Sequence, residues 1–246
     1  ARRLEGFVLR RADLVVVVSE ELRRFALSRG AREGRVLTIP NAVDVEAFRP
    51  LDAELGADAR RRFGLSPNGN GPGLVLGFSG FVREWHRLDL VLSCLGRPEL
   101  ADARLVVVGE GPRSEWIARR AAELGVSDRV LQAGDRRHEE MPGLVAAFDV
   151  ALLPGAPPYA SPLKLYEYLA AGLPVVATAV CGTPEIVLDG LTGWLVPPED
   201  APALARAIDR LVTMPPAARR AMGEAGRARV RNEFRMERQV DAVLAE

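Results

Sequence analysis

The stretch SPLKLYEYLAAG, residues 161–172, combines a helix start with side chains suited to binding phosphate. Ser161 is a favourable N-cap and proline suits the first helical position, so the stretch predicts a helix over residues 162–171. Lys164 and Glu167 then lie three residues apart on one face of its first two turns. A cation here opposes the helix dipole, whereas the free amides and the lysine together favour a bound anion. The pattern predicts a phosphate site; an exposed Lys–Glu pair is the simpler alternative.

The acid of this pair has a chemical role beside a phosphate. A carboxylate just inside a phosphate-binding helix can accept two hydrogen bonds from the ribose hydroxyls of a nucleotide. We therefore expect Lys164 to contact a diphosphate and Glu167 to contact the ribose.

Two glycines follow an apolar run in VVVGEGPRSEW. Gly109 and Gly111 allow backbone to approach a ligand closely, and the next proline can open a helix. The G-x-G spacing lacks the third glycine of the dinucleotide fingerprint, so it argues little for a nicotinamide cofactor. A tight strand-to-helix turn is the equal alternative.

The stretch GFSGFVREWHR places Gly80 and three basic side chains near a helix start. Arg83 can make bidentate contacts to a pyrophosphate. Arg87 is more typical of a solvated surface. His86 and His138 are the two histidines; neither has a Ser/His/Asp or metal-ligand spacing around it, and His138 fits a surface position at a helix start.

The loop AVCGTPEIV is a further candidate for the edge of a ligand-binding crevice. Gly182, Thr183 and Glu185 are expected to border the same crevice, with a purely structural turn as the alternative. The rule that connects these loops is the binding of ligands outside the carboxyl ends of strands in doubly wound sheets. It predicts that the loops after the strands at 74–79, 104–109, 129–134 and 149–154 converge on one crevice.

Alternation along the chain predicts an α/β doubly wound fold with a parallel six-stranded sheet and a partial N-terminal segment. Short β-branched runs, apolar on both faces, alternate with amphipathic stretches. The expected strands are 14–18, 35–39, 74–79, 104–109, 129–134, 149–154, 174–178 and 193–197. The expected helices are 20–29, 84–96, 113–124, 138–147, 162–171 and 200–212, with further helical pattern from 216 to the end.

The alternation breaks at residues 41–72, where prolines and SPNGNGPG indicate a linker. Residues 73–232 then form a nucleotide-binding type of domain, and 233–246 a C-terminal helix. Residues 1–40 hold only two strands, which is too few for an independent sheet of this kind. They fit the end of a domain whose earlier part is missing.

Composition excludes several classes of protein. The 246 residues are 48% hydrophobic, and 33 basic residues balance 33 acidic ones, so no global field recruits nucleic acid. Cys94 and Cys181 lie far apart and offer no disulfide framework, which favours a reducing compartment, the cytoplasm. No apolar run is long enough to span a membrane, and the N-terminus does not fit a signal peptide.

Residues 14–212 resemble the group-1 family of retaining, nucleotide-sugar-dependent glycosyltransferases with the two-domain GT-B fold. The resemblance rests on the order and spacing of several motifs: ADLVVVVSEELRRF, VLTIPNAVDVEAFRP, LVVVGEGP, FDVALLP, LYEYLAAGLPVVAT and GTPEIVLDGLTGWLVPPED. It implies that residues 73–232 are the Rossmann-like, donor-binding C-terminal half, and that about the first 150 residues of a typical member are absent, the acceptor site with them.

Two departures accompany the resemblance. Glu167 matches the second glutamate of the family's E-x7-E motif, expected on the ribose, whereas the first falls at Tyr159. The family's arginine and lysine pair falls at Phe81 and His86, and Arg83 is expected to replace it. The chain is instead similar to a branch with SPxK[LI][FY]EY, in which Ser161, Leu163 and Lys164 hold the phosphates. The full expectation is Arg83 and Lys164 as catalytic residues, and Gly80, His86, Gly109, Gly111, Leu131, Tyr159, Ser161, Leu163, Leu165 and Glu167 as the nucleotide-sugar-binding set.

The resemblance implies transfer of a sugar, with retention, from a donor such as a UDP- or GDP-sugar, which is a substrate and not a cofactor. It implies a glycan, lipid or small-molecule acceptor and the missing N-terminal domain as a partner, and it allows peripheral contact with a membrane. The residues themselves require no metal ion, because no DxD pair of carboxylates occurs in a loop and arginine and lysine can neutralise the diphosphate. A non-catalytic nucleotide-sugar-binding module, or a half-enzyme completed by another chain, is the alternative. A nucleotide-sugar epimerase would need catalytic carboxylates and histidines that the sequence does not offer.

Overall fold

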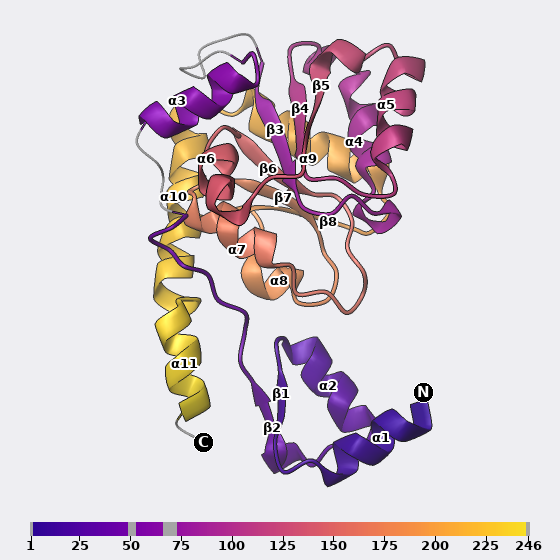
Figure 1. Cartoon of the computed structure of the whole chain (residues 1–246), viewed down its shortest axis with the longest axis vertical. Coiled ribbons are helices and arrows are strands. Elements are labelled where there is room, and N and C mark those ends of the chain that lie inside the picture. The colour runs from indigo at the N-terminus through magenta and orange to yellow at the C-terminus, as the bar shows by residue number, and fades with distance from the viewer. Residues whose placement is uncertain (1, 49–52, 66–72, 245–246) are drawn as a thin grey trace.

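The computed structural model describes residues 2–48, 53–65 and 73–244. Figure 1 shows a large lobe built on a parallel sheet above a small lobe that contains the N-terminus. Helices α10 (Pro216–Glu233) and α11 (Met236–Leu244) run along one side of the large lobe and continue down toward the small one.

The sheet of the large lobe has six parallel strands in the order β5-β4-β3-β6-β7-β8. All six strands predicted from the sequence are confirmed, each within two residues of its expected bounds. They are β3 (Val75–Ser79), β4 (Arg104–Val108), β5 (Val130–Gly134), β6 (Val150–Leu153), β7 (Val175–Thr178) and β8 (Gly193–Val196). The α/β doubly wound fold is therefore confirmed.

The strands are apolar on both faces because helices cover both. Along β4, Val106 and Val108 belong to one core cluster, whereas Leu105 and Val107 belong to the other. The first cluster lies under α3 (Ala53–Arg62), α6 (Met141–Val145), α7 (Leu163–Ala170) and α10. The second lies under α4 (Leu88–Leu95), α5 (Ser114–Glu123) and α9 (Ala201–Thr213). Burial of both faces explains the continuous runs of valine and leucine.

The order of the strands reverses at β3, which pairs with β4 on one side and β6 on the other. Chain connections leave the sheet in opposite directions at this point, so their loops separate and leave an opening at the carboxyl ends of the strands. This topology places the candidate site.

Helix α4 begins later than its sequence pattern predicts. Helical character was expected from residue 84, but Glu84–His86 form a 3-10 turn and the α-helix begins at Leu88. Arg87 between them has a left-handed backbone (φ 50°) and forms ion pairs with Asp89 and Glu199. These contacts hold an arginine that the sequence had suggested was simply solvated.

The small lobe contains α1 (Arg2–Arg11), β1 (Val15–Val17), α2 (Glu20–Ser28) and β2 (Val36–Thr38). Both predicted strands are confirmed and pair in parallel, and α2 was also expected; α1 was not predicted. A further helix that the sequence analysis missed, α3, lies within the expected linker and packs against α6. Most of SPNGNGPG lies outside the described residues.

Within the described ranges, no helix has both the length and the apolar character needed to cross a lipid bilayer.

We predict that α10 depends on a glycine to dock against the end of α7. A Cβ at Gly223 would lie 1.8 Å from the carbonyl oxygen of Gly172, so Gly223→Ala should lower the free energy of unfolding by about 2 kcal/mol. Gly143→Ala in α6 is the matched control, because no atom lies within 4 Å of its added Cβ. Urea denaturation should show the control unchanged or stabilised by up to ~1 kcal/mol. Equal stability of the two variants would contradict this packing.

Candidate functional site

A crevice of about 390 Å³ opens at the carboxyl ends of the central strands. Its walls come from the loops that follow β3, β4 and β5 and from the first turns of α7, which follows β6. The convergence of four loops predicted from the sequence is therefore confirmed. The lining residues are Ser79, Gly80, Phe81, Val108, Gly109, Asp135, Arg136, Met141, Leu163, Lys164 and Glu167.

Two glycines bring backbone segments close together at the floor of the crevice. Gly80 (φ 120°) and Gly109 (φ 114°) have conformations that side chains rarely adopt. A Cβ at Gly80 would lie 2.8 Å from Lys164 Nζ, and one at Gly109 would lie 2.5 Å from the Gly80 carbonyl oxygen. Gly111 does not line the crevice; its Cβ would meet the Val82 carbonyl oxygen at 2.3 Å, so this glycine serves loop packing.

Lys164 is the single lysine of the chain, among 33 basic residues. Its Nζ lies 4.0 Å from the ring centroid of Phe78. In the described part of the chain no carboxylate lies within ion-pair distance of this ammonium group. Burial lowers the pKa of Lys164 to about 7, and the charge of nearby Glu167 raises it only partly. The crevice therefore contains a partly buried lysine with no described carboxylate at ion-pair distance.

Glu167 lies one turn further along α7 and lines the same crevice. Burial raises the pKa of its carboxyl group, while His138 and Lys164 act in the opposite direction. Glu167 is partly buried and lines the crevice, so its carboxylate can accept hydrogen bonds from a ligand bound there.

The start of α7 differs from the sequence prediction. Ser161 was expected to cap the helix, but Pro162 occupies the cap position and no side chain caps the first turn. The Ser161 hydroxyl instead accepts a hydrogen bond from Asn41 Nδ2 at 3.2 Å, and the Ser161 carbonyl accepts another at 3.1 Å. Asn41, which lies between the two lobes in the chain, thus bonds the serine hydroxyl that was expected to cap α7.

His86 stands behind the crevice and does not line it. Its ring packs on Phe78, with ring centroids 4.9 Å apart, and its Nδ1 accepts a hydrogen bond from the Arg83 amide at 3.3 Å. Burial, followed by the charges of Lys164 and Arg83, lowers the pKa of His86 to about 3. The histidine is therefore neutral at physiological pH, which fits a structural role in packing against Phe78.

The other predicted residues also lie outside the crevice lining. Arg83 is exposed, with its guanidinium 4.5 Å from the ring centroid of Phe81 and 5.3 Å from that of Trp85. Tyr159 is 67% exposed. Leu165 is completely buried in the core, and Leu131 packs partly buried against that core. The structure thus brings together Gly80, Gly109, Leu163, Lys164 and Glu167.

The sequence of the large lobe matches a described protein family. The family described as "Glycosyl transferases group 1" matches residues 73–214, more than half of the chain. The chain belongs to the group-1 glycosyltransferase family.

Curated relatives agree with this family assignment. Over 207 residues this chain is 38% identical to the D-inositol 3-phosphate glycosyltransferase of Stackebrandtia nassauensis, an alignment that covers 78% of the chain and 44% of the relative. It is 32% identical over 250 residues to the enzyme of that name from Mycobacterium bovis, covering 98% of the chain and 49% of the relative. The chain spans about half the length of these curated relatives.

Solved glycosyltransferase structures share the fold. HepE from Anabaena, solved with UDP and glucose, has a TM-score of 0.87 at 20% identity over 99% of this chain and 65% of its own. Sucrose-phosphate synthase from Thermosynechococcus elongatus has a TM-score of 0.83 at 28% identity over 99% of this chain and 59% of its own. The resemblance to the GT-B fold stated from the sequence is confirmed.

Sequence reasoning missed two charged residues that line the crevice, Asp135 and Arg136. Arg136 follows β5 directly and lines the crevice together with Lys164. Its neighbour Asp135 ties two loops together, because Asp135 Oδ1 accepts a hydrogen bond from the Glu110 amide at 3.0 Å. The position of Arg136 just after a predicted strand was the available signal, but the run DRRHEE offered several charges and no means of choosing between them.

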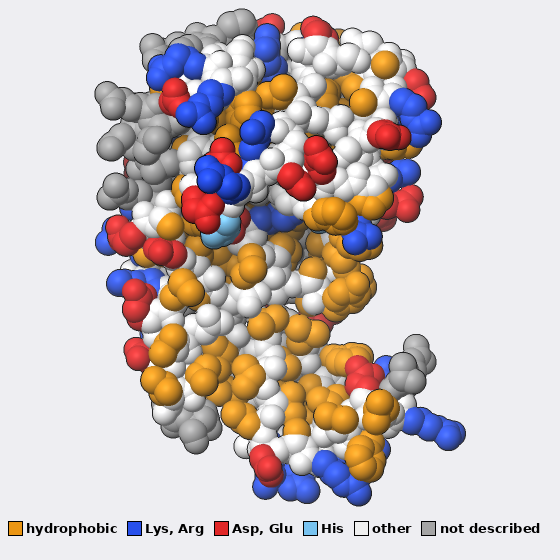
Figure 2. Space-filling model, viewed as in Figure 1, with side chains coloured by type: hydrophobic (Ala, Val, Ile, Leu, Met, Phe, Trp, Pro, Cys, Tyr) orange, Lys and Arg blue, Asp and Glu red, His pale blue; other side chains and the backbone are white. Residues whose placement is uncertain are grey.

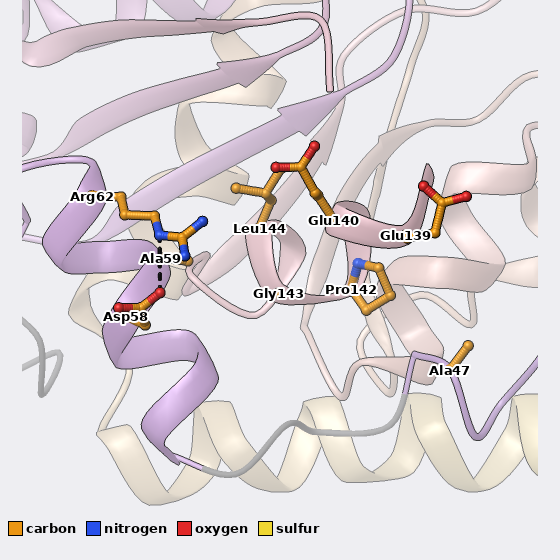
Figure 3. Close-up of a pocket in the computed structure, with 9 residues that line it drawn as sticks. All are labelled: Ala47, Asp58, Ala59, Arg62, Glu139, Glu140, Pro142, Gly143 and Leu144. Carbon is orange, nitrogen blue, oxygen red and sulfur yellow. Dashed lines mark ion pairs between the residues drawn. The ribbon is translucent and has the colours of Figure 1, made fainter. Parts of the chain in front are cut away.

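Two further pockets lie beside the crevice. One, of about 480 Å³, shares Leu163 and Glu167 with it and extends past Phe48 to Met236. The other, of about 340 Å³, lies between α3 and α6, where Asp58 and Arg62 form an ion pair at 2.9 Å (Figure 3). Among the described residues, no group of three or more histidine, cysteine or acidic side chains is placed to hold a metal ion.

We predict that Lys164 titrates near pH 7. Reductive methylation with ¹³C labels only this lysine and the amino terminus, so its NMR signal should shift with a midpoint of about 7, and Lys164→Met should lack that signal. Between this value and its ordinary pKa of 10.5 the unfolded chain binds a proton that the folded chain does not. The free energy of unfolding should therefore rise with pH in this window, by up to about 1.4 kcal/mol per unit, and less so in Lys164→Met. A midpoint near 10 would contradict the burial of this ammonium group.

Proposed function

We propose that this chain is the donor-binding half of a retaining glycosyltransferase that uses a nucleoside-diphosphate sugar. One observation carries the proposal: Lys164, at the start of α7, is partly buried, has no described carboxylate at ion-pair distance, and lines a crevice together with Gly80 and Gly109. A diphosphate supplies the missing negative charge, and Glu167 one turn away accepts hydrogen bonds from the ribose. The relationship to HepE, which was solved with UDP, supports this choice of ligand.

The leaving diphosphate is where charge grows in the transition state. Cationic groups that are already aimed at that position lower the barrier without rearranging, and a site of low dielectric constant strengthens their effect. Lys164 takes this role at the crevice floor, with Arg83 as the second cation expected from the sequence. The acceptor attacks the sugar from the same face, which retains the anomeric configuration. No separate cofactor is needed for this step, because the nucleotide sugar is a substrate.

Arg136 is a competing candidate for the second cation. Both arginines are exposed, but only Arg136 lines the crevice, and Arg83 lies over Phe81 and Trp85. Phe81 and His86 stand where the family places its cationic pair, so the second cation comes either from Arg83 of the same loop or from another loop. Arg136 approaches from the β5 loop and has no ion pair with a described residue.

The acceptor side of the reaction belongs to the rest of the protein and to its small lobe. The curated relatives are about twice as long as the aligned chain, so we propose an N-terminal domain as the partner that binds the acceptor. Figure 2 shows hydrophobic side chains gathered over the lower part of the molecule, and Leu4, Phe7, Val16 and Val240 are among the exposed ones. A glycan, a lipid or a small molecule such as a phosphorylated polyol remains the proposed class of acceptor.

A non-catalytic nucleotide-sugar-binding module is the second candidate, favoured by the half-length match to the relatives. Release of UDP from UDP-sugars, measured with this chain alone and with an N-terminal domain added, separates the two. Turnover in either sample supports the enzyme. Binding without turnover in both supports the binding module.

We predict that Glu167→Ala weakens UDP binding about tenfold, because two hydrogen bonds to the ribose are lost. Isothermal titration calorimetry measures the dissociation constant. Glu123→Ala is the matched control, since Glu123 pairs with Arg120 on α5 and does not line the crevice. An unchanged affinity in Glu167→Ala would remove the ribose assignment.

We predict that Arg136→Ala weakens UDP binding more than Arg83→Ala, by about fivefold to tenfold, because only Arg136 lines the crevice. The difference should shrink at high salt, since part of the contact is exposed to screening. Arg137→Ala is the matched control: this neighbouring arginine pairs with Glu140 at 3.4 Å and is absent from the lining. A larger loss in Arg83→Ala would restore the assignment made from the sequence.

A further inference from the structure

The motif Gly182, Thr183 and Glu185 does not line the crevice. It lies in the loop after β7 and in the short helix α8 (Thr183–Ile186), where the large lobe meets the first turn of α2 in the small lobe. The sequence had placed it at the crevice edge. Its contacts assign it a different role.

Glu185 bonds to the small lobe through both oxygens of its carboxylate. Oε1 and Oε2 accept from the backbone N–H of Glu20 at 3.1 and 3.2 Å. This amide belongs to the first residue of α2 and has no acceptor within its own helix. A carboxylate at a helix N-terminus is also favoured by the helix dipole, and a charge-assisted bond is stronger than a neutral one.

The surroundings of this contact are closely packed. Ser19, the N-cap of α2, is completely buried and accepts a hydrogen bond from the Leu22 amide at 3.2 Å. Its Oγ lies 3.9 Å from Cys181 Sγ, and a Cβ on Gly182 would lie 3.0 Å from its Cβ. The two lobes thus meet through small side chains, and a glycine allows the close approach.

Helix α10 of the large lobe holds the backbone of Glu185 in place. Arg229 of α10 donates to the Glu185 carbonyl at 2.7 Å and to the Ile186 carbonyl at 3.2 Å. Because α8 is fixed to α10 in this way, the bond from the Glu185 carboxylate to the Glu20 amide holds α2 in place relative to the large lobe.

A second polar contact joins the two lobes at the start of α7. Asn41, just after β2, donates to Ser161 immediately before α7. Both contacts therefore join segments that follow strands of the small lobe, α2 after β1 and Asn41 after β2, to segments at the carboxyl edge of the large sheet. That edge carries Lys164.

We propose that Glu185 is a positioning residue, which fixes the small lobe over the donor crevice by accepting from the first amide of α2. It does not touch the donor. The bond between the lobes stands on its own geometry, whereas its value for sugar transfer rests on the proposed function.

Two substitutions remove this bond from opposite sides. Glu185→Ala removes the acceptor, and Glu20→Pro removes the amide donor. Proline suits the first position of a helix, and the extended backbone of Ser19 (φ −157°, ψ 158°) is compatible with a following proline. Glu20→Ala is the matched control, because it keeps the amide and loses only the side chain that pairs with Arg23. Glu185→Gln keeps an acceptor oxygen without its charge and should be intermediate.

Hydrogen exchange measures how firmly α2 is held. We expect amides of residues 21–28 to exchange about tenfold faster in Glu185→Ala and in Glu20→Pro, and no faster still in the double variant, because both changes remove one bond. Exchange in α5 should stay unchanged, as should all exchange in Glu20→Ala. Unchanged protection of α2 in both single variants would overturn the proposal.

Crosslinking tests the relative position of the lobes directly. Ser19→Cys places a thiol beside the natural Cys181, while Cys94 is buried. A mild oxidant such as diamide should join the two cysteines, and the rate should fall about fivefold or more when Glu185→Ala is added. Equal rates in both backgrounds would show that Glu185 does not hold the lobes together.

Binding of UDP separates this role from the donor site. Glu185→Ala should leave the dissociation constant within about twofold of the unmodified protein, whereas a loss as large as that of Glu167→Ala would make Glu185 part of the donor site and overturn the positioning role. If the unmodified protein binds no nucleotide, the proposed function fails, and the exchange and crosslinking results still decide the contact.

Discussion

A partly buried lysine with no described carboxylate at ion-pair distance is the constraint on which the rest of this site depends. Lys164 loses much of its hydration and gains a weaker substitute in the ring face of Phe78. Apart from the two histidines, every other basic side chain in the chain is an arginine. Arginine keeps its proton under almost all conditions, whereas a lysine is a compact charge whose pKa shifts with burial. A bound diphosphate would restore the full charge of this group, which couples binding to protonation.

The position of this cation follows from the topology of the sheet. Because β3 is the point at which the strand order reverses, the loops after β3 and β4 face the start of α7 across one opening. Glycine at position 80 leaves room for the Lys164 side chain, and glycine at position 109 lets its loop approach the backbone of Gly80. The same sheet that forms the core thus determines where the crevice lies.

The junction of the lobes explains why a local rule fails at α7. Ser161 has the right type and position for an N-cap, but Asn41 uses its hydroxyl. Glu185 shows the converse: it caps α2 from the other lobe, far away in sequence. Departures from local preference are expected where function or a tertiary contact takes precedence. In this protein they lie where the two lobes meet beside the crevice.

The sequence by itself determined the eight strands, most of the helices and their order, because buried parallel strands leave continuous apolar runs and amphipathic helices leave a period of 3.6; it missed α1 and α3. It also identified Lys164 and Glu167, since their spacing on one helix face is a local property. Only the tertiary structure decided that Leu165 is core, that Arg136 and not Arg83 lines the crevice, and that Glu185 contacts α2. Those outcomes depend on which distant segments meet, and the pattern of residues along one segment carries no information about its partner across the fold.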